Sequence, residues 1–118
     1  MAETTLPGTV RQGEWPVWQP LVDLVSEVVA EWFMWMYEIE LADGSPLHAY
    51  KHVATRQYLH LTEGGRAFVY VSPETYLEIP PRRAVREAVA GWDELLPQPD
   101  DPDAVREALR RACGSAVI

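Results

Sequence analysis

The sequence of 118 residues contains one cysteine, one lysine and no asparagine. Because Cys113 stands alone, an internal disulfide framework and a metal site built from several cysteines are both excluded. Cys113 follows Leu109 by four residues in a helical apolar pattern, which is more typical of a small core residue than of a reactive thiol. Nine arginines against a single lysine, together with the missing asparagine, are typical of GC-rich coding and indicate a bacterial source.

Net positive charge and long apolar runs are also absent. The formal net charge is −8 at pH 7, and a surface this acidic repels phosphate backbones, so general binding of nucleic acid is disfavoured. No apolar run approaches the roughly 18 residues of a membrane-spanning helix, and the first residues lack the basic and apolar regions of a signal peptide. No glycine-rich nucleotide-binding motif is present, so no cofactor is expected. We therefore expect a cytoplasmic protein.

The first 19 residues are rich in proline, and we interpret residues 1–19 as an extended arm that precedes a single domain, residues 20–118. Within the arm, the sequence WPVWQP places Trp15 and Trp18 on backbone that the prolines hold near polyproline geometry. Two tryptophans exposed on a loose arm would leave a large apolar surface in water. We expect them to pack on the domain or to dock on a partner, including a second copy of the chain.

Two periodic segments follow the arm. The apolar residues first recur at helical spacing, which predicts a helix over about 20–31. The period then changes to two, which predicts a strand over about 33–41. In a regular strand the large residues would share one face, and the methionines and glutamates would share the other. The first set is Phe33, Trp35, Tyr37, Ile39 and Leu41, and the second is Met34, Met36, Glu38 and Glu40.

The rest of the chain predicts further strands and two more helices. Turn signals at Asp43-Gly44 and Gly64-Gly65 indicate two hairpins. The strands are expected at about 46–56, 57–62, 66–71 and 75–80. Pro80-Pro81 begins a helix through RRAVREAVAGWDELL, and Asp101 caps a last helix over about 102–113. This order predicts an α+β fold, in which one N-terminal and two C-terminal helices pack on a mostly antiparallel sheet of about five strands.

All three histidines and the only lysine lie in the stretch PLHAYKHVATRQYLHL. Residues 46–56 fit a strand after the preceding turn, and they also fit a helix that begins at the proline, with the strand favoured. In both conformations His48 and His52 lie on the same side of the segment. In the strand, Tyr50 joins them on that face and Lys51 points to the opposite one.

Four interpretations of this stretch are open. A zinc site would join His60, from a neighbouring strand, to His48 and His52, although no strict ligand spacing is present. Catalysis would use His52 as a general base, with Lys51 or Arg56 stabilising an anion. The stretch could instead recognise an anionic or polar ligand, or be ordinary sheet surface, which is favoured. The candidate ligand-binding residues are His48, Tyr50, His52, Arg56, Tyr58, His60 and Arg66.

A second candidate contact site lies at the start of the helix after Pro80-Pro81. There Arg82 and Arg83 add positive charge at the positive end of the helix dipole, a mild misfit that could mark an interaction site alongside Trp15 and Trp18. We predict a small non-catalytic protein-interaction or regulatory module that binds a protein partner or itself. The alternative is a small enzyme, or a protein that binds an anion or a metal ligand through a sheet face shared by His48, His52 and His60, with Arg56.

Overall fold

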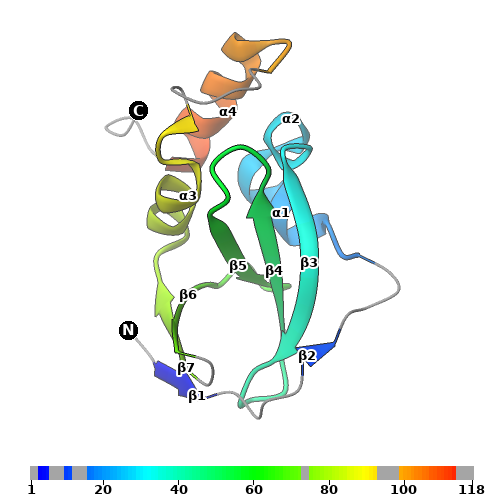
Figure 1. The fold of residues 1–118 in the computed structure, drawn as a ribbon, viewed down its shortest axis with the longest axis vertical. Coiled ribbons are helices and arrows are strands. Elements are labelled where there is room, and N and C mark those ends of the chain that lie inside the picture. The colour runs from blue at the N-terminus through cyan, green and yellow to red at the C-terminus, as the bar shows by residue number, and fades with distance from the viewer. Residues whose placement is uncertain (1–2, 6–9, 12–15, 73–74, 93–98, 114–118) are drawn as a thin grey trace.

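The computed structural model describes residues 3–5, 10–11, 16–72, 75–92 and 99–113, which form one bent antiparallel sheet with helices packed against it (Figure 1). The sheet has seven strands in the order β1-β7-β6-β5-β4-β3-β2. The strands are β1 (Glu3–Thr5), β2 (Val10–Arg11), β3 (Phe33–Glu40), β4 (Pro46–His52), β5 (Tyr58–Thr62), β6 (Ala67–Ser72) and β7 (Thr75–Ile79). The helices are α1 (Gln19–Val25), α2 (Glu27–Ala30), α3 (Pro81–Val89) and α4 (Pro102–Cys113). The predicted α+β class and its antiparallel sheet are therefore confirmed.

Two pieces of the N-terminal segment are the outermost strands of the sheet. β1 pairs with β7, and β2 pairs with β3, so the two pieces lie at opposite edges. Only residues 6–9 separate β1 from β2, and a chain of that length spans at most about 17 Å. The sheet must therefore bend until its edges approach each other. Trp15 lies outside the described residues, and the division into an arm and a domain stays a prediction.

The two predicted hairpin turns are present, and each uses a glycine in the left-handed region of backbone space. Gly44 has φ 87° and Gly65 has φ 89°, values that residues with a Cβ rarely adopt. The first turn is closed by the Leu41 N–H, which donates to the Ser45 carbonyl at 2.8 Å. β4 follows this turn directly, so the strand interpretation of residues 46–56 is confirmed over the helical one as far as His52, after which residues 53–55 form a turn.

A β-bulge interrupts β3 and changes which side chains share a face. Trp35 lies opposite Tyr50 and Tyr37 lies opposite Ala49, so Met36 is an extra residue without its own partner on β4. Adding one residue reverses the alternation of all side chains beyond it. The prediction that Phe33, Trp35, Tyr37, Ile39 and Leu41 share one face is therefore wrong. Phe33 and Trp35 lie on the face that packs against the helices, whereas the later residues lie on the other face.

The helix predicted over 20–31 is broken into α1 and α2 at Ser26. Ser26 has φ 73°, a left-handed conformation that is unfavourable for any residue with a Cβ. The hydrogen bonding continues across the break, because the Ser26 N–H donates to the Val22 carbonyl at 2.9 Å and the Ala30 N–H donates to the Ser26 carbonyl at 2.9 Å. The apolar period also continues across it, so the sequence pattern alone could not reveal the break.

The two C-terminal helices begin as predicted. α4 starts after Asp101, whose Oδ1 accepts the Ala104 N–H at 3.1 Å as an N-cap. α3 ends at Val89, earlier than predicted, because Gly91 has φ 86° and turns the chain so that Trp92 is buried. Within the part of the chain that the structure describes, no helix combines the length and apolar character needed to cross a membrane.

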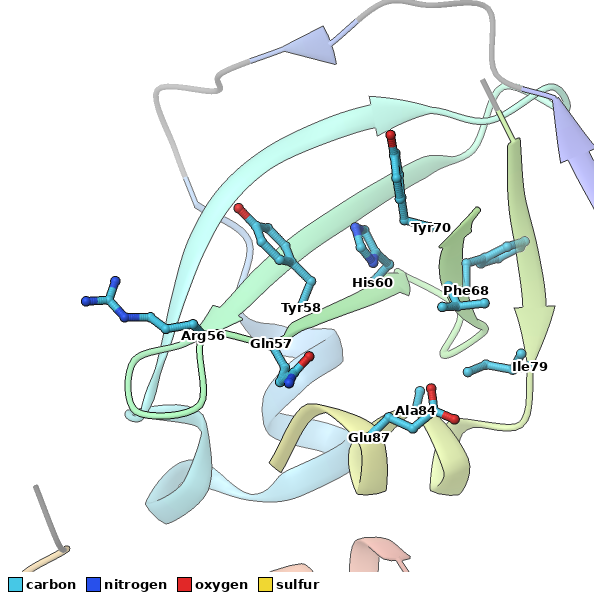
Figure 2. Close-up of a pocket in the computed structure, with 10 residues that line it drawn as sticks. Arg56, Gln57, Tyr58, His60, Phe68, Tyr70, Ile79, Ala84 and Glu87 are labelled. Carbon is cyan, nitrogen blue, oxygen red and sulfur yellow. The ribbon is translucent and has the colours of Figure 1, made fainter. Parts of the chain in front are cut away.

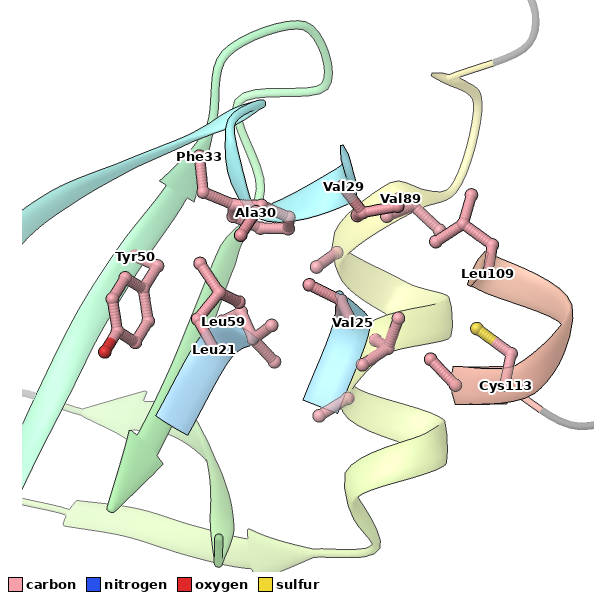
Figure 3. Close-up of a cluster of buried hydrophobic side chains, with 14 of the residues drawn as sticks. Leu21, Val25, Val29, Ala30, Phe33, Tyr50, Leu59, Val89, Leu109 and Cys113 are labelled. Carbon is pink, nitrogen blue, oxygen red and sulfur yellow. The ribbon is translucent and has the colours of Figure 1, made fainter. Parts of the chain in front are cut away.

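Buried side chains form two clusters, one on each face of the sheet. The larger cluster fills the space between the sheet and the helices, and it includes Leu21, Val25, Tyr50, Leu61 and Val85, all of which are fully buried (Figure 3). Each large apolar side chain buried in this way stabilises the fold by about 1.5–3 kcal/mol. Cys113 belongs to this cluster, and burial raises the pKa of its thiol, as expected for a core residue. The smaller cluster, on the opposite face, consists of Ile39, Leu41, Leu47, Phe68 and Tyr76.

Candidate functional site

The three histidines lie on two different faces of the sheet. In the strand register His48 lies opposite Leu61 and His52 lies opposite Phe33, which places both histidines on the face that packs against the helices. His60 lies opposite Ala49 and therefore points to the other face. The hypothesis of one sheet face shared by all three histidines is wrong, and so is the three-histidine zinc site built on it. Among the described residues, no group of three or more His, Cys, Asp or Glu side chains is placed to hold a metal ion.

His48 is fully buried and hydrogen-bonded through both ring nitrogens. The Trp35 indole N–H donates to its Nδ1 at 3.2 Å, and its Nε2 lies 3.1 Å from Oε2 of Glu63. An indole N–H can only donate, so Nδ1 carries no proton and Nε2–H must donate to the carboxylate. Both nitrogens are therefore used within the protein, which leaves His48 a structural role between β3 and the second hairpin turn.

His52 is also fully buried and supports the turn after β4. Its Nδ1 accepts the Ala54 N–H at 3.1 Å and the Thr55 N–H at 3.2 Å, which satisfies two backbone donors in the turn. The ring lies between aromatic neighbours, with centroid distances of 4.9 Å to Phe33 and 4.3 Å to Trp92. Burial lowers the pKa of His52 to about 4. His52 is therefore neutral at pH 7 and enclosed by the core rather than available to a substrate.

Tyr50, on the same face, fixes the segment that enters α1. Its hydroxyl donates to the Val17 carbonyl at 2.5 Å, and its ring lies 5.7 Å from the ring of Trp18. Burial raises the pKa of the Tyr50 hydroxyl well above its usual value. Trp18 keeps 38% of its surface exposed, so it packs on the domain with one face and meets solvent with the other.

A cleft of about 230 Å³ opens between β5 and β6 and reaches down to α3 (Figure 2). It exists because the two strands pair only at His60–Phe68 and Leu61–Ala67, and beyond these pairs they separate. Tyr58, His60 and Tyr70 project to one side of the sheet in Figure 2. Ala84 and Glu87 from α3 lie beneath. Within the part of the chain that the structure describes, this cleft is lined by three of the predicted ligand-binding residues, Arg56, Tyr58 and His60, and is therefore the candidate binding site.

His60 lies at the inner end of the cleft and is 4% exposed. Its ring stacks on Tyr58 with a centroid distance of 5.7 Å and an interplanar angle of 15°, and it meets the edge of Tyr76 at 5.0 Å. Within the described part of the chain, neither ring nitrogen makes a hydrogen bond. Burial lowers the pKa of His60 to about 4, so its ring is neutral at pH 7 and offers one N–H donor and one nitrogen acceptor to the cleft.

Four tyrosines surround His60 on this face. Tyr76 is buried and Tyr37 is partly buried, their hydroxyls share a hydrogen bond, and the pKa of each is raised, chiefly by burial. Tyr58 and Tyr70 are 39% and 51% exposed, and they stand on the two strands that border the cleft. Neighbouring rings hold both in place, since Tyr70 meets Tyr76 at 5.6 Å and Tyr58 stacks on His60. The rim of the cleft is therefore aromatic and ordered.

The predicted basic residues of the stretch are separated from one another. Arg66 pairs with Glu78 at 3.0 Å and with Asp43 at 3.5 Å, and these carboxylates hold the pKa of Arg66 above its usual value. Arg56, which has φ 64°, is at the rim of the cleft, and in Figure 2 its side chain points away from the other lining residues. Lys51 points away from the face of His48 and His52, as predicted, and this places it on the face of His60, with Nζ 5.7 Å from the Tyr58 ring centroid. A continuous basic surface is therefore not formed.

Trp18, Arg82 and Arg83, the described members of the predicted contact set, do not line the cleft. Arg82 and Arg83 are exposed near the start of α3, where Arg83 pairs with Glu87 at 2.8 Å. Sequence reasoning missed Tyr70 and Glu87 as lining residues. Their placement depends on how far β5 and β6 separate, and no residue pattern within either strand signals that separation.

Comparisons of the chain with protein-family models, with curated proteins and with solved structures gave no match.

Proposed function

We propose that the protein is a non-catalytic binding module that recognises a protein partner through the tyrosine-lined cleft between β5 and β6. The observation that carries this proposal is the pair Tyr58 and Tyr70, which stand exposed on either side of the cleft. Tyrosine is enriched in protein-recognition surfaces because it offers a large apolar ring and a hydroxyl at a small cost in side-chain entropy. Here that cost is lowered further, because neighbouring rings already hold both side chains.

The charge of the chain supports a protein partner with a basic contact surface. The formal net charge is −8, and Glu87 adds a carboxylate to the floor of the cleft. Complementary charge increases the rate of encounter and discriminates against acidic partners. A second copy of this chain carries the same net charge, so electrostatics favours a different protein over self-association at low salt.

A second candidate function rests on His60. Its imidazole is buried, lines the cleft and has a pKa lowered to about 4. Such perturbed groups also occur at sites where small molecules bind or react. The volume argues for the first candidate, because pockets for drug-sized ligands are usually about 300–1,000 Å³. A cleft of about 230 Å³ suits a small part of a larger partner.

The test is selection of binding peptides from a displayed library of random 12-residue sequences. We expect sequences that bind the wild-type protein and lose at least tenfold in affinity with the double variant Y58A/Y70A. The control is Trp18→Ala, because Trp18 has comparable exposure but contacts Tyr50 on the opposite face of the sheet. Loss of binding with Trp18→Ala alone, or selection of no peptide, would contradict the proposal. A fragment screen in which binding depends on His60 and not on the two tyrosines would favour the second candidate.

A further inference from the structure

The backbone groups of β5 alternate between β4 and the cleft. The His52 N–H donates to the Gln57 carbonyl at 2.9 Å, so the backbone groups of Gln57 point to β4. The Thr62 N–H donates to the Arg66 carbonyl at 2.9 Å, so the backbone groups of Thr62 point to β6. In an antiparallel sheet this direction alternates along the strand. The N–H and C=O of Tyr58 therefore point toward β6, which has moved away at this position.

The same alternation applies to β6. The backbone N–H and C=O groups of His60 and Phe68 point toward each other between β5 and β6. The next pair of residues with this direction would be Tyr58 and Tyr70. The ladder stops before reaching it. Among the described residues the β5–β6 ladder pairs only His60 with Phe68 and Leu61 with Ala67, so Tyr58 and Tyr70 are not paired with each other. Two strands thus present facing backbone donors and acceptors to an open space.

A backbone group that lacks a partner is costly once water is removed from it, so such an edge is a ready template for another extended chain. Natural proteins usually pair or cover the edge strands of a sheet, or place charges on them. Here the facing sides of β5 and β6 stay open beyond the last pair of their ladder. His60, 4% exposed and without a hydrogen bond in the described part of the chain, adds a side-chain donor and acceptor at the inner end. The cleft therefore offers hydrogen-bonding groups that match a peptide backbone.

The size of the cleft limits how much chain it can hold. β5 and β6 are joined at His60–Phe68, so a strand that enters from the open end cannot continue past this pair. A cleft of about 230 Å³ admits only a short end of a chain. The occupant must therefore end or turn there, and the rest of it would lie over the exposed rings of Tyr58 and Tyr70.

We propose that the occupant is an extended segment of a partner protein, which inserts its last residues between β5 and β6 and forms main-chain hydrogen bonds with Tyr58 and Tyr70. This inference rests on the proposed function and specifies how the partner is held. The segment carries a lysine or arginine close to its inserted end, because Glu87 lines the cleft in a protein of net charge −8. The Arg83 that pairs with Glu87 is about half exposed, so an incoming cation can replace it at small cost.

The test uses the tightest peptide selected from the random library and replaces each of its amides in turn by an N-methyl amide. A segment between two strands directs successive amides to β5 and β6 in turn, so we expect tenfold or greater losses of affinity at the adjacent amides of the inserted end and small changes at amides that lie outside the cleft. Uniformly small losses, or losses confined to amides outside the inserted end, would overturn the proposed mode while leaving the proposed function in place. If the library yields no peptide, both fail together.

Amide hydrogen exchange followed by NMR gives an independent readout on the protein itself. In the free protein the Tyr58 and Tyr70 amides should exchange rapidly, and the peptide should slow them at least tenfold. The Leu59 and Val69 amides point to β4 and β7, so they should be slow in both states and serve as internal controls. Unchanged exchange at Tyr58 and Tyr70 in a saturated complex would overturn the proposed mode.

The charge requirement is tested with Glu87→Gln. We expect a severalfold loss of affinity for a peptide with a basic residue near its inserted end, and no loss for the same peptide with glutamine there. Glu107→Gln is the matched control, since Glu107 also pairs with a neighbouring arginine on a helix but lies outside the cleft. Equal effects of the two variants would exclude a role for Glu87 in recognition.

Discussion

Replacement of His60 by phenylalanine should make the protein less sensitive to acid. His60 is 4% exposed and stacked among tyrosines, and burial lowers its pKa to about 4 from the usual 6.5. Between these two values the unfolded chain binds a proton at this residue and the folded protein does not. His60 therefore does not lower the unfolding free energy above pH 6.5, and the unfolding free energy falls through His60 as the pH drops from 6.5 toward 4.

The size of this effect follows from the two pKa values. One unit of pKa difference corresponds to about 1.4 kcal/mol, so the wild-type protein should lose about 2 kcal/mol of unfolding free energy between pH 8 and pH 5 through His60 alone. The loss should approach about 3 kcal/mol at pH 4. Natural domains of this size have total stabilities of about 5–15 kcal/mol, so the effect is easily measured. His52, whose pKa burial also lowers to about 4, acts in the same direction and remains in both proteins.

The assay is urea unfolding of wild-type protein and His60→Phe at pH 8 and pH 5. The difference in unfolding free energy at pH 8 reports the change in packing, and phenylalanine keeps an aromatic ring between Tyr58 and Tyr76. Between pH 8 and pH 5 this difference should shift by about 2 kcal/mol in favour of the variant. A shift below about 0.5 kcal/mol would refute the reasoning. So would an NMR titration in which the His60 ring of the folded protein gains its proton near pH 6.5.

Three further predictions concern the fold. Trp35→Phe should lower the unfolding free energy by about 2 kcal/mol, because it leaves Nδ1 of the buried His48 without its donor. Deletion of Met36 should leave a cooperatively folded protein, because the bulge residue is removed and all other side chains keep their faces, whereas deletion of Glu38 should abolish cooperative folding. Asp101→Ala should destabilise the protein by about 1 kcal/mol through loss of the α4 cap. Urea unfolding and near-UV circular dichroism measure all three.

Two control variants test the physical reasons given for the Trp35→Phe and Asp101→Ala predictions. Glu63→Gln keeps an acceptor for Nε2–H of His48, so it should cost clearly less than Trp35→Phe, and an equal cost would contradict the assigned tautomer. Asp100→Ala removes the same charge one residue before the cap without removing the hydrogen bond. If it destabilises the protein as much as Asp101→Ala, the effect is general electrostatics rather than capping.

Much of the fold could be predicted because it depends on local signals. The change from helical to alternating period near residue 32 marks the start of β3, and glycines at Gly44 and Gly65 mark both hairpin turns. Asp101 followed by proline marks the start of α4. Each signal involves only neighbouring residues, so it is visible in the sequence before any tertiary contact is known.

The candidate site could not be predicted because it depends on strand register. Which face His60 occupies is set by the length of the turn between β4 and β5, and a change of one residue would reverse it. The bulge at Met36 similarly divides β3 between the two faces without any unusual residue to signal it. The cleft arises from a pairing that stops after two residues, a tertiary feature that neither strand encodes by itself. Histidines crowded in the sequence therefore said little about their arrangement in space.

β1 pairs with β7 and β2 pairs with β3, so strands from one short N-terminal segment cover the β7 edge and the β3 edge of the sheet. Each of these pairings covers backbone groups that could otherwise recruit a strand from another molecule. A single proteolytic cut that released the first 11 residues would uncover both borders together. Each uncovered edge, β7 on one side and β3 on the other, would then be available to pair with a strand of another molecule.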